Sequence, residues 1–358
     1  MAALHHRGDT LNHEQLGLGL FPDLPPGPQP TVSVKKRLVR VPKPPLASAE
    51  PVAAPSVPLD IESMARALEG HPDYRIQRRL QPRLLWPADA PQSVTRVVVL
   101  DTETTGLDQS KEVIIELALL VVDVDNATGL PVGKVEVYDG LEDPGTPIPK
   151  EIVAITGITD ADVHGHRLDE ARVAELLLGA DLVIAHNAGF DRPFVEARLK
   201  QFADLPWACS FADIEWKAQG RGSAKLESLA QAMGLFYDAH RAEMDCHALL
   251  AVLAAPLPQS AHTGLAQLLK AAALPSFRLS ATNAPFESKD KLKARGYRWN
   301  GDQRVWQTRL SDPAALQEEF AWLKENAYNH RSAVVQLEKM DARTKYSARG
   351  GEVTYQQL

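Results

Sequence analysis

The stretch VVVLDTETTGL, residues 97–107, decides the fold of this chain. Four consecutive apolar residues predict a strand that is buried on both faces, and Asp101 and Glu103 follow on one face of that strand. Two buried carboxylates repel each other and are costly to desolvate, so they persist where a cation neutralises them. The stretch therefore predicts half of a metal site, and the other half must come from elsewhere in the sequence.

Two further segments supply matching polar residues. In LVIAHNAGFDRPFV, residues 182–195, an apolar strand leads to Asn187 and then to Asp191 at the start of a helix. In HRAEMD, residues 240–245, His240 and Asp245 lie five apart near the beginning of a helix, so one can ligate a metal while the other acts from the side. Ligands that are all oxygen select Mg²⁺ or Mn²⁺.

The three motifs DTETTGL, HNAGFD and HRAEMD resemble those of the DEDDh 3′→5′ exonucleases of the ribonuclease H-like superfold. That group includes the proofreading epsilon subunit of bacterial replicative polymerase. TGIT at 156–159 and KLESLAQAMGL at 225–235 also match what the family places between the motifs, and the resemblance covers about residues 95–255.

The resemblance implies a role for each polar residue. Two ions of Mg²⁺ or Mn²⁺ are expected, held by Asp101, Glu103, Asp191 and Asp245, with Asp101 bridging both. His240 is the implied general base, because an imidazole is largely neutral at cytosolic pH and accepts a proton. The implied substrate contacts are Thr104, Thr105, Gly106, Leu107, Asn187 and Phe190. Core packing is the alternative role of Leu107 and Phe190.

Three neighbouring polar residues are left out of the site. Glu116 and Asp123 lie on an apolar strand, but their flanks favour an outward or edge position. His186 is expected to form a structural hydrogen bond rather than to ligate a metal.

The fold class predicted for the chain is α/β, a ribonuclease H-like mixed sheet flanked by helices. Hairpins come first and alternating helices and strands follow, which is typical of such a sheet. The expected divisions are a disordered proline-rich tail, a helical and basic linker, the exonuclease domain, a small α+β accessory module that is basic and aromatic, and a loose tail, at 1–59, 60–92, 93–255, 276–328 and 329–358.

Two accessory segments suggest partners. Residues 276–328 interleave cations with tyrosine and tryptophan, which suits single-stranded nucleic acid, although a small fold also needs such rings as its core. QLGLGLF in the proline-rich tail resembles the peptide by which bacterial repair and replication proteins hook the sliding clamp. Its residues are Gln15, Leu16, Leu18, Leu20 and Phe21 within the stretch 15–21.

The composition limits the kind of protein. The 358 residues are 44% hydrophobic and 24% charged, which is enough apolar material for one large domain or two ordinary ones. A net charge of −7 argues against a protein that binds nucleic acid through bulk charge. Two cysteines, Cys209 and Cys246, exclude a disulfide scaffold and fit a reducing cytoplasm. No apolar run reaches the roughly 18 residues of a membrane span.

The sequence therefore predicts a cytoplasmic, metal-dependent 3′→5′ exonuclease. Its expected substrate is the 3′ end of DNA, most simply single-stranded, and its expected products are 5′-mononucleotides, in repair or replication. An RNA 3′-end trimming enzyme is the alternative, because the motifs do not tell the two sugars apart. A non-catalytic adaptor tethered to a clamp or to DNA is the alternative from another class. The presence of all five catalytic-type residues speaks against the adaptor.

Overall fold

The computed structural model describes residues 60–88, 91–311 and 313–358. The proline-rich tail and the clamp-peptide hypothesis for residues 15–21 lie outside these ranges. The chain divides into two compact units, Met1–Tyr74 and Arg75–Leu358, and each is taken by itself. The described part of the first holds helix α1 (Ile61–Glu69), whose first turn is capped by the Asp60 carboxylate, the acceptor of the Glu62 N–H at 3.2 Å. This helix lies within residues 60–92, the range expected to be a helical and basic linker.

A six-stranded mixed sheet forms the centre of the second unit. Its strands lie in the order β2-β5-β4-β3-β6-β7, with β3, β4 and β5 antiparallel and β6 and β7 parallel to β3. This order is ribonuclease H-like and confirms the predicted fold class. The bounds are β2 (Leu85–Trp86), β3 (Val94–Thr104), β4 (Ile114–Asp125), β5 (Pro131–Leu141), β6 (Leu182–Ala185) and β7 (Trp207–Cys209).

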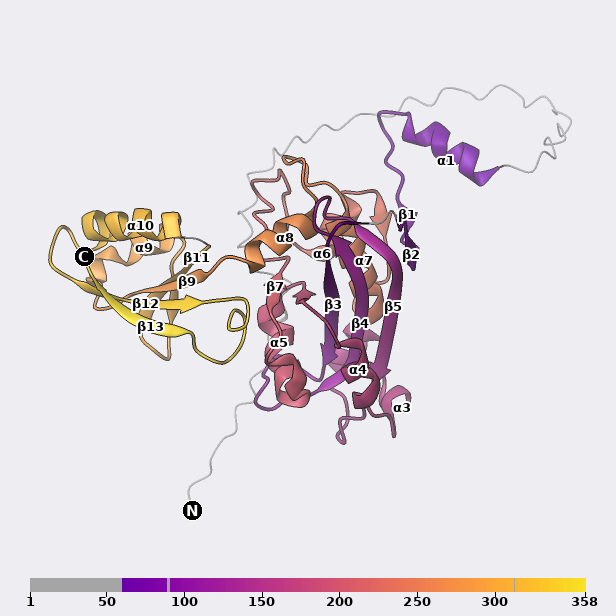
Figure 1. The fold of residues 1–358 in the computed structure, drawn as a ribbon, viewed down its shortest axis with the longest axis horizontal. Coiled ribbons are helices and arrows are strands. Elements are labelled where there is room, and N and C mark those ends of the chain that lie inside the picture. Colours follow the sequence, from indigo (N-terminus) through magenta and orange to yellow (C-terminus); the bar gives the residue numbers. More distant parts are fainter. Residues whose placement is uncertain (1–59, 89–90, 312) are drawn as a thin grey trace, which may run out of the picture. The chain divides into compact units, whose positions relative to one another are not determined.

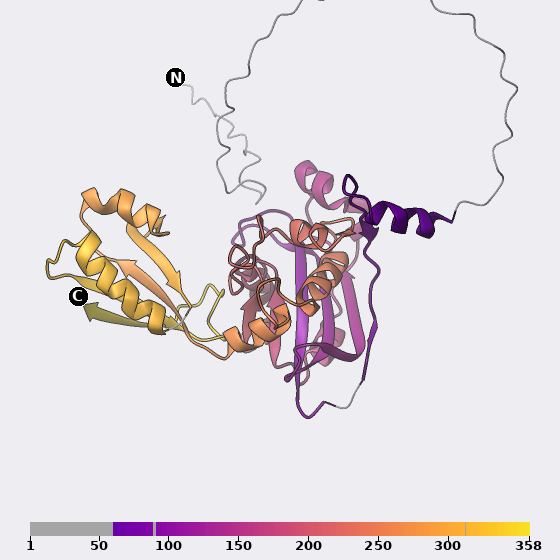
Figure 2. The same cartoon turned by 90° about the horizontal axis from the view of Figure 1, so that it is seen from above.

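Helices cover both faces of this sheet (Figures 1 and 2). Val97 and Val99 of β3 pack into one cluster with α6 (Leu226–Gln231), α7 (Ala242–Ala254) and α8 (Gly264–Ala272). Val98 and Leu100 pack into a second cluster with α4 (Glu170–Leu176) and α5 (Ala188–Arg198). All four side chains are fully buried, so the predicted strand with two buried faces is confirmed. The sequence did not predict α8.

Smaller elements complete the nuclease part of the unit. Helices α2 (Lys150–Thr156) and α3 (Asp160–Val163) connect β5 to α4, and the 3-10 turn η2 (Lys200–Phe202) follows α5. Strands β1 (Arg78–Arg79) and β8 (Leu235–Phe236) form a short parallel pair. No helix in the described ranges is long and apolar enough to cross a membrane.

A five-stranded antiparallel sheet follows, in the order β10-β11-β9-β12-β13. Strands β10 and β11 form a hairpin whose turn includes Gly301, and helix α10 follows it. The bounds are β9 (Ser276–Ala281), η3 (Phe286–Ser288), α9 (Lys289–Ala294), β10 (Arg298–Asn300), β11 (Val305–Leu310), α10 (Pro313–Trp322), the π-helical turn η4 (Leu323–Ala327), β12 (Val334–Met340) and β13 (Glu352–Gln357).

The expectation of a loose tail after residue 328 is wrong. Strand β12 pairs with β9 and β13 pairs with β12, so the last thirty residues contribute two strands to this sheet. The physical reason is an alternation in VVQLEKM: Val335 is fully buried and Leu337 packs beside it, in the cluster that contains Phe277.

Several of the basic and aromatic residues in 276–328 serve this small fold itself. Tyr297 is only 2% exposed and belongs to the core. The Lys291 ammonium donates to the Asn326 carbonyl at 3.0 Å, and the Arg295 guanidinium pairs with Glu318 and Glu319. The core interpretation therefore holds for Tyr297, while Lys291 and Arg295 are exposed and bond to other residues of the same small fold.

Candidate active site

The C-terminal end of β3 carries the first two carboxylates. Asp101 and Glu103 are two residues apart on one strand, so their side chains project from the same face of the sheet. Their direct partners across β4 are Ala118 and Glu116. The small Ala118 side chain leaves room beside Asp101, and the face on which both carboxylates lie is the one covered by α7.

The entry to α7 brings the third carboxylate to this face. His240 has a backbone φ of 65°, in the left-handed region, and the chain there turns into the helix. Asp245 accepts hydrogen bonds from the backbone N–H groups of His240 at 2.8 Å and Arg241 at 3.2 Å. It also accepts a hydrogen bond from the Tyr237 hydroxyl at 2.9 Å. These bonds fix the carboxylate of Asp245 and still leave lone pairs on its oxygens for another ligand.

Asp101, Glu103 and Asp245 form one cluster. One carboxylate oxygen of each lies within 4.8 Å of the others, and the three residues together could hold a metal ion. Burial raises the pKa of Glu103 to about 8, and the carboxylates of Asp245 and Glu116 add to this rise. Burial also raises the pKa of Asp101 well above its ordinary value, with the neighbouring acidic groups contributing.

The chemistry of this cluster fits a divalent cation. Within the described ranges, none of the three carboxylates forms an ion pair with a lysine or arginine. Repelling carboxylates in a partly dry site are stabilised either by protons or by a cation of higher charge. The donor set is all oxygen, which is the set that Mg²⁺ and Mn²⁺ prefer.

Asp191 approaches this cluster from the first turn of α5. The residue is 2% exposed, and its carboxylate accepts hydrogen bonds from the backbone N–H of Thr102 at 3.1 Å and from the Thr102 hydroxyl at 2.8 Å. Burial raises the pKa of Asp191 to about 7, although the Thr102 bonds oppose the rise. Asp191 also raises the pKa of Asp101, more than any other neighbouring charge. The structure thus gathers three of the four expected ligands tightly and places the fourth beside Asp101, outside the tight group.

The expectation that Glu116 lies outward or at an edge is wrong. Glu116 is fully buried directly across from Glu103, and the Arg241 guanidinium donates to it at 2.8 and 3.0 Å. The backbone N–H of Ala242, the first residue of α7, also donates to it at 2.9 Å. Glu116 therefore anchors the start of the helix that carries Asp245. Asp123, by contrast, is partly exposed and pairs with Arg96 at 3.6 Å.

The remaining predicted residues surround the cluster in different ways. Thr104 and Thr105 are buried, and their hydroxyls hold the loop by donating to the Gly106 carbonyl at 2.6 Å and to Glu112 at 2.5 Å. Leu107 is 47% exposed, so it does not pack in the core.

The second motif places a further group of predicted residues. Asn187 is exposed with a φ of 74°, and Phe190 is partly buried against Phe194 at a ring distance of 5.1 Å. The His186 ring makes a hydrogen bond of 2.7 Å with Ser210, which confirms its expected structural role. Burial lowers the pKa of His186 to about 4. His240 is exposed, beside the cluster.

Comparison with known proteins supports one family. A protein-family model described as "Exonuclease" (RNase_T) matches residues 98–253. The DNA polymerase III subunit epsilon of Treponema pallidum is 30% identical over 158 residues, which are 40% of this chain and 68% of that protein. The PolC-type DNA polymerase III of Thermotoga petrophila is 31% identical over 153 residues, 41% of this chain. The match spans only 11% of the length of that polymerase.

Two solved structures are also similar. Exonuclease X in complex with 5′ overhanging duplex DNA is 26% identical, with a TM-score of 0.34, and the match covers 44% of this chain and 89% of that one. E. coli Exonuclease I in complex with a dA16 oligonucleotide is 15% identical, with a TM-score of 0.41, and the match covers 66% and 69% of the two chains. On the family match and the epsilon-subunit relative, this chain belongs to the DEDD 3′→5′ exonuclease family, whose members hydrolyse nucleic acid.

Proposed function

We propose that the chain is a metal-dependent 3′→5′ exonuclease that removes nucleotides from single-stranded 3′ ends of DNA as 5′-monophosphates, in repair or replication. The observation that carries the proposal is the cluster of Asp101, Glu103 and Asp245, with their oxygens within 4.8 Å, inside the region that matches the exonuclease family. DNA is favoured over RNA because the relatives at 30% and 31% identity are DNA polymerase III proteins.

The proposed ligands of two Mg²⁺ or Mn²⁺ ions are the three clustered carboxylates and Asp191. When bound, such ions supply Lewis acidity to the phosphate and lower the pKa of water. Thr102 holds one oxygen of Asp191 and leaves the other free to ligate. Tyr237 donates to one oxygen of Asp245 and two backbone N–H groups donate to the other, so both oxygens are oriented before a ligand binds.

His240 is the proposed general base. Its exposed imidazole belongs to the same short segment that fixes Asp245, because the His240 N–H donates to that carboxylate at 2.8 Å. A neutral imidazole there takes the proton of the attacking water, and the carboxylates remain acceptors only. Hydrolysis then breaks the bond between phosphorus and the 3′ oxygen of the penultimate nucleotide, so the product keeps its 5′ phosphate.

The proposed substrate contacts lie at the end of β3 and the start of α5. The loop of Thr104, Thr105 and Gly106 is braced by its own hydroxyl bonds, so its backbone groups can meet the terminal nucleotide at low entropic cost. Leu107 is proposed to wedge beside a base, which its 47% exposure supports. Asn187 and Phe190 are the proposed contacts to the sugar and base.

A substrate panel tests this proposal. The full chain is incubated with 5′-labelled DNA and RNA of matched sequence, single-stranded and duplex, in Mg²⁺, Mn²⁺ or EDTA. The expected result is a ladder that shortens from the 3′ end of single-stranded DNA only with metal. A faster ladder on RNA would instead identify a 3′-end trimming enzyme for RNA. Complete inactivity with every substrate and metal would favour the adaptor.

A further inference from the structure

The five-stranded sheet has one covered face and one uncovered face. Phe277, Leu279 and Val335 point from its strands into a cluster that also contains residues of α9 and α10. Both helices lie on this side of the sheet (Figure 1). Side chains alternate along a strand, so the residues between these apolar positions project from the opposite face.

One row of residues crosses the uncovered face from edge to edge. Directly paired residues in antiparallel strands share a face. The strand register pairs one residue from each of β10, β11, β9, β12 and β13 in turn: Arg298, Gln307, Ser280, Gln336 and Tyr355. Gln336 is partly exposed, Arg298 is exposed and Tyr355 is 69% exposed, whereas Ser280 at the centre is buried. The Gln307 amide donates to Ser280 and Gln303 and accepts from Asn300, so it braces the middle of the row. The row thus offers the amide of Gln336 beside an aromatic ring at one edge and a guanidinium at the other.

The charge on this face is positive. The next row contains Arg309, Arg278 and Glu338. Glu338 is the one carboxylate at a strand position of this face in the described sheet, and it is 6% exposed and paired with Arg278 at 2.8 Å. The helices on the other face carry both signs of charge: α9 has Lys289, Lys291 and Lys293 with Asp290, and α10 has Glu318 and Glu319. The excess of arginine at the strand positions of the uncovered face favours a polyanion there.

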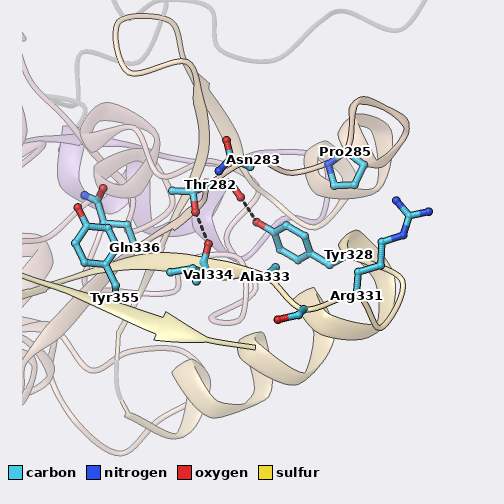
Figure 3. Close-up of a pocket in the computed structure, with 10 residues that line it drawn as sticks. Thr282, Asn283, Pro285, Tyr328, Arg331, Ala333, Val334, Gln336 and Tyr355 are labelled. Carbon is cyan, nitrogen blue, oxygen red and sulfur yellow. Dashed lines mark hydrogen bonds between the residues drawn. The ribbon is translucent and has the colours of Figure 1, made fainter.

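A cavity of about 690 Å³ adjoins the tyrosine end of the row. Gln336 and Tyr355 lie together at one side of it and Arg331 extends at the other (Figure 3). Its wall is fixed because the Tyr328 hydroxyl donates to the Thr282 carbonyl at 2.7 Å, and the Thr282 hydroxyl donates to the Val334 carbonyl. The cavity has room for a flat heterocycle beside a phosphate-binding cation.

We propose that this row and its cavity form a second binding site for single-stranded DNA, separate from the active site. The proposal rests on the function proposed above, since the ligand is the strand that the nuclease degrades. Bases stack on Tyr355, the amide of Gln336 bonds a base edge, and Arg298 and Arg331 meet phosphates. A second contact raises the local concentration of the strand at the nuclease without any change in the catalytic residues.

Binding of a long strand tests this site. The full chain with Asp101→Asn, which blocks degradation, is titrated against 5′-fluorescein dT30 by anisotropy. Tyr355→Ala is expected to weaken binding by roughly 5-fold to 100-fold, the range measured when a stacking aromatic is truncated. Arg298→Glu, at the other edge of the sheet, is expected to weaken binding and to flatten its salt dependence. The matched control is Lys293→Glu, the same charge change on exposed α9, with less than a twofold effect.

A small substrate separates this proposal from the proposed function. The p-nitrophenyl ester of thymidine 5′-monophosphate reports the active site alone, and the Tyr355→Ala and Arg298→Glu enzymes with Asp101 intact are expected to hydrolyse it at the wild-type rate. Affinities for dT30 within twofold of the parent in both variants would overturn the second site. Failure of the wild type to hydrolyse the ester would count against the nuclease assignment, while the dT30 titrations still decide the second site. Thermal melts confirm that each variant is folded.

Discussion

Glu103 and Glu116 face each other across β3 and β4, yet the protein treats their charges in opposite ways. Glu116 is fully buried, and Arg241 and the first N–H of α7 surround its carboxylate. Among the residues that the structure describes, Glu103 has no such hydrogen-bonded partner, and burial raises its pKa to about 8. The fold neutralises the charge of Glu116 and leaves that of Glu103 unneutralised. We infer that Glu103 interacts with a group that the chain itself does not supply. We take that missing partner to be a divalent cation.

The same contrast recurs between adjacent residues in α5. Asp191 receives hydrogen bonds but no ion pair from the described part of the chain, and burial raises its pKa to about 7. Arg192, with a fully buried side chain, pairs with Glu196 at 2.6 Å. It also donates to the Ala342 carbonyl at 3.1 Å and to the Lys345 carbonyl at 2.5 Å. Compensated charges therefore fasten the architecture, and uncompensated charges mark the candidate site.

The sharpest way to break the comparison is to remove an uncompensated charge. Asp101→Asn is expected to reduce nuclease turnover by about 10⁴-fold, because the proposed bridging ligand is lost. In EDTA the same variant is expected to be at least as stable as the wild type, since one buried repulsion disappears. Rates on 5′-labelled DNA and chemical denaturation in EDTA measure the two effects.

Asp123→Asn is the control for that variant. Asp123 lies on the same strand pair but is partly exposed and paired with Arg96, so its replacement should leave turnover within about twofold. Normal turnover in Asp101→Asn would place the reaction elsewhere.

The site residues that the sequence predicted are those whose role follows from their immediate neighbours in the sequence. Asp101 and Glu103 follow an apolar run directly, and two-residue spacing on a strand fixes a common face whatever the strand pairs with. The fold class followed from the same local logic. The role of Glu116 was not predicted because it depends on Arg241, which lies 125 residues further along the chain. The signal that could have found it is the hairpin register, which sets Glu116 directly across from Glu103.

The two strands after residue 328 were not predicted, for a similar reason. Strand β13 is exposed along its whole length, and its two alternating apolar residues, Val353 and Tyr355, are too few to predict a buried face. Its order comes from pairing with β12, and β12 in turn pairs with β9, which lies more than fifty residues earlier. The burial of Arg192 could not be predicted from its local sequence either, because the carbonyl groups that accept its hydrogen bonds belong to residues 342–345.

The next largest effect is expected from a compensated charge. Arg192→Met should lower the free energy of unfolding by about 4 kcal/mol, because it strands buried carbonyl groups and leaves Glu196 without its buried partner. Urea denaturation measures this effect. The control is Arg343→Met, an exposed arginine in the segment that receives Arg192, expected to cost less than about 1 kcal/mol. Equal losses in both variants would contradict the assignment of Arg192 as an architectural charge.

Metal and pH together probe the uncompensated charges. A carboxyl whose pKa is raised by folding, as Glu103 is from 4.5 to about 8, binds more protons in the folded state. Its stabilising contribution is complete below pH 4.5 and is lost as the pH rises toward 8, so stability in EDTA should fall over this range. Mn²⁺ should reverse the loss at pH 8, by about 2.7 kcal/mol at a free concentration 100 times its Kd. Denaturation at pH 5 and pH 8 tests both statements, and the Asp101→Asn/Glu103→Gln protein should show little response to Mn²⁺.

The smallest expected effect comes from removing the guanidinium that neutralises Glu116, so that this buried carboxylate becomes an uncompensated charge as well. Arg241→Met leaves Glu116 uncompensated, and we expect the free energy of unfolding to fall by about 2 kcal/mol, limited because the Arg241 side chain is 48% exposed.

The positive charge of Arg241 also lowers the pKa of Glu103, so its removal should shift the acid limb of the activity profile to higher pH. Glu116→Gln removes a charge that raises the pKa of Glu103 and should shift the acid limb to lower pH. Opposite shifts would show that the pair sets the protonation of the site as well as the position of α7, and the double variant should recover most of the lost stability. Shifts of the same sign would mean that Glu116 acts on the site only through the packing of the helix.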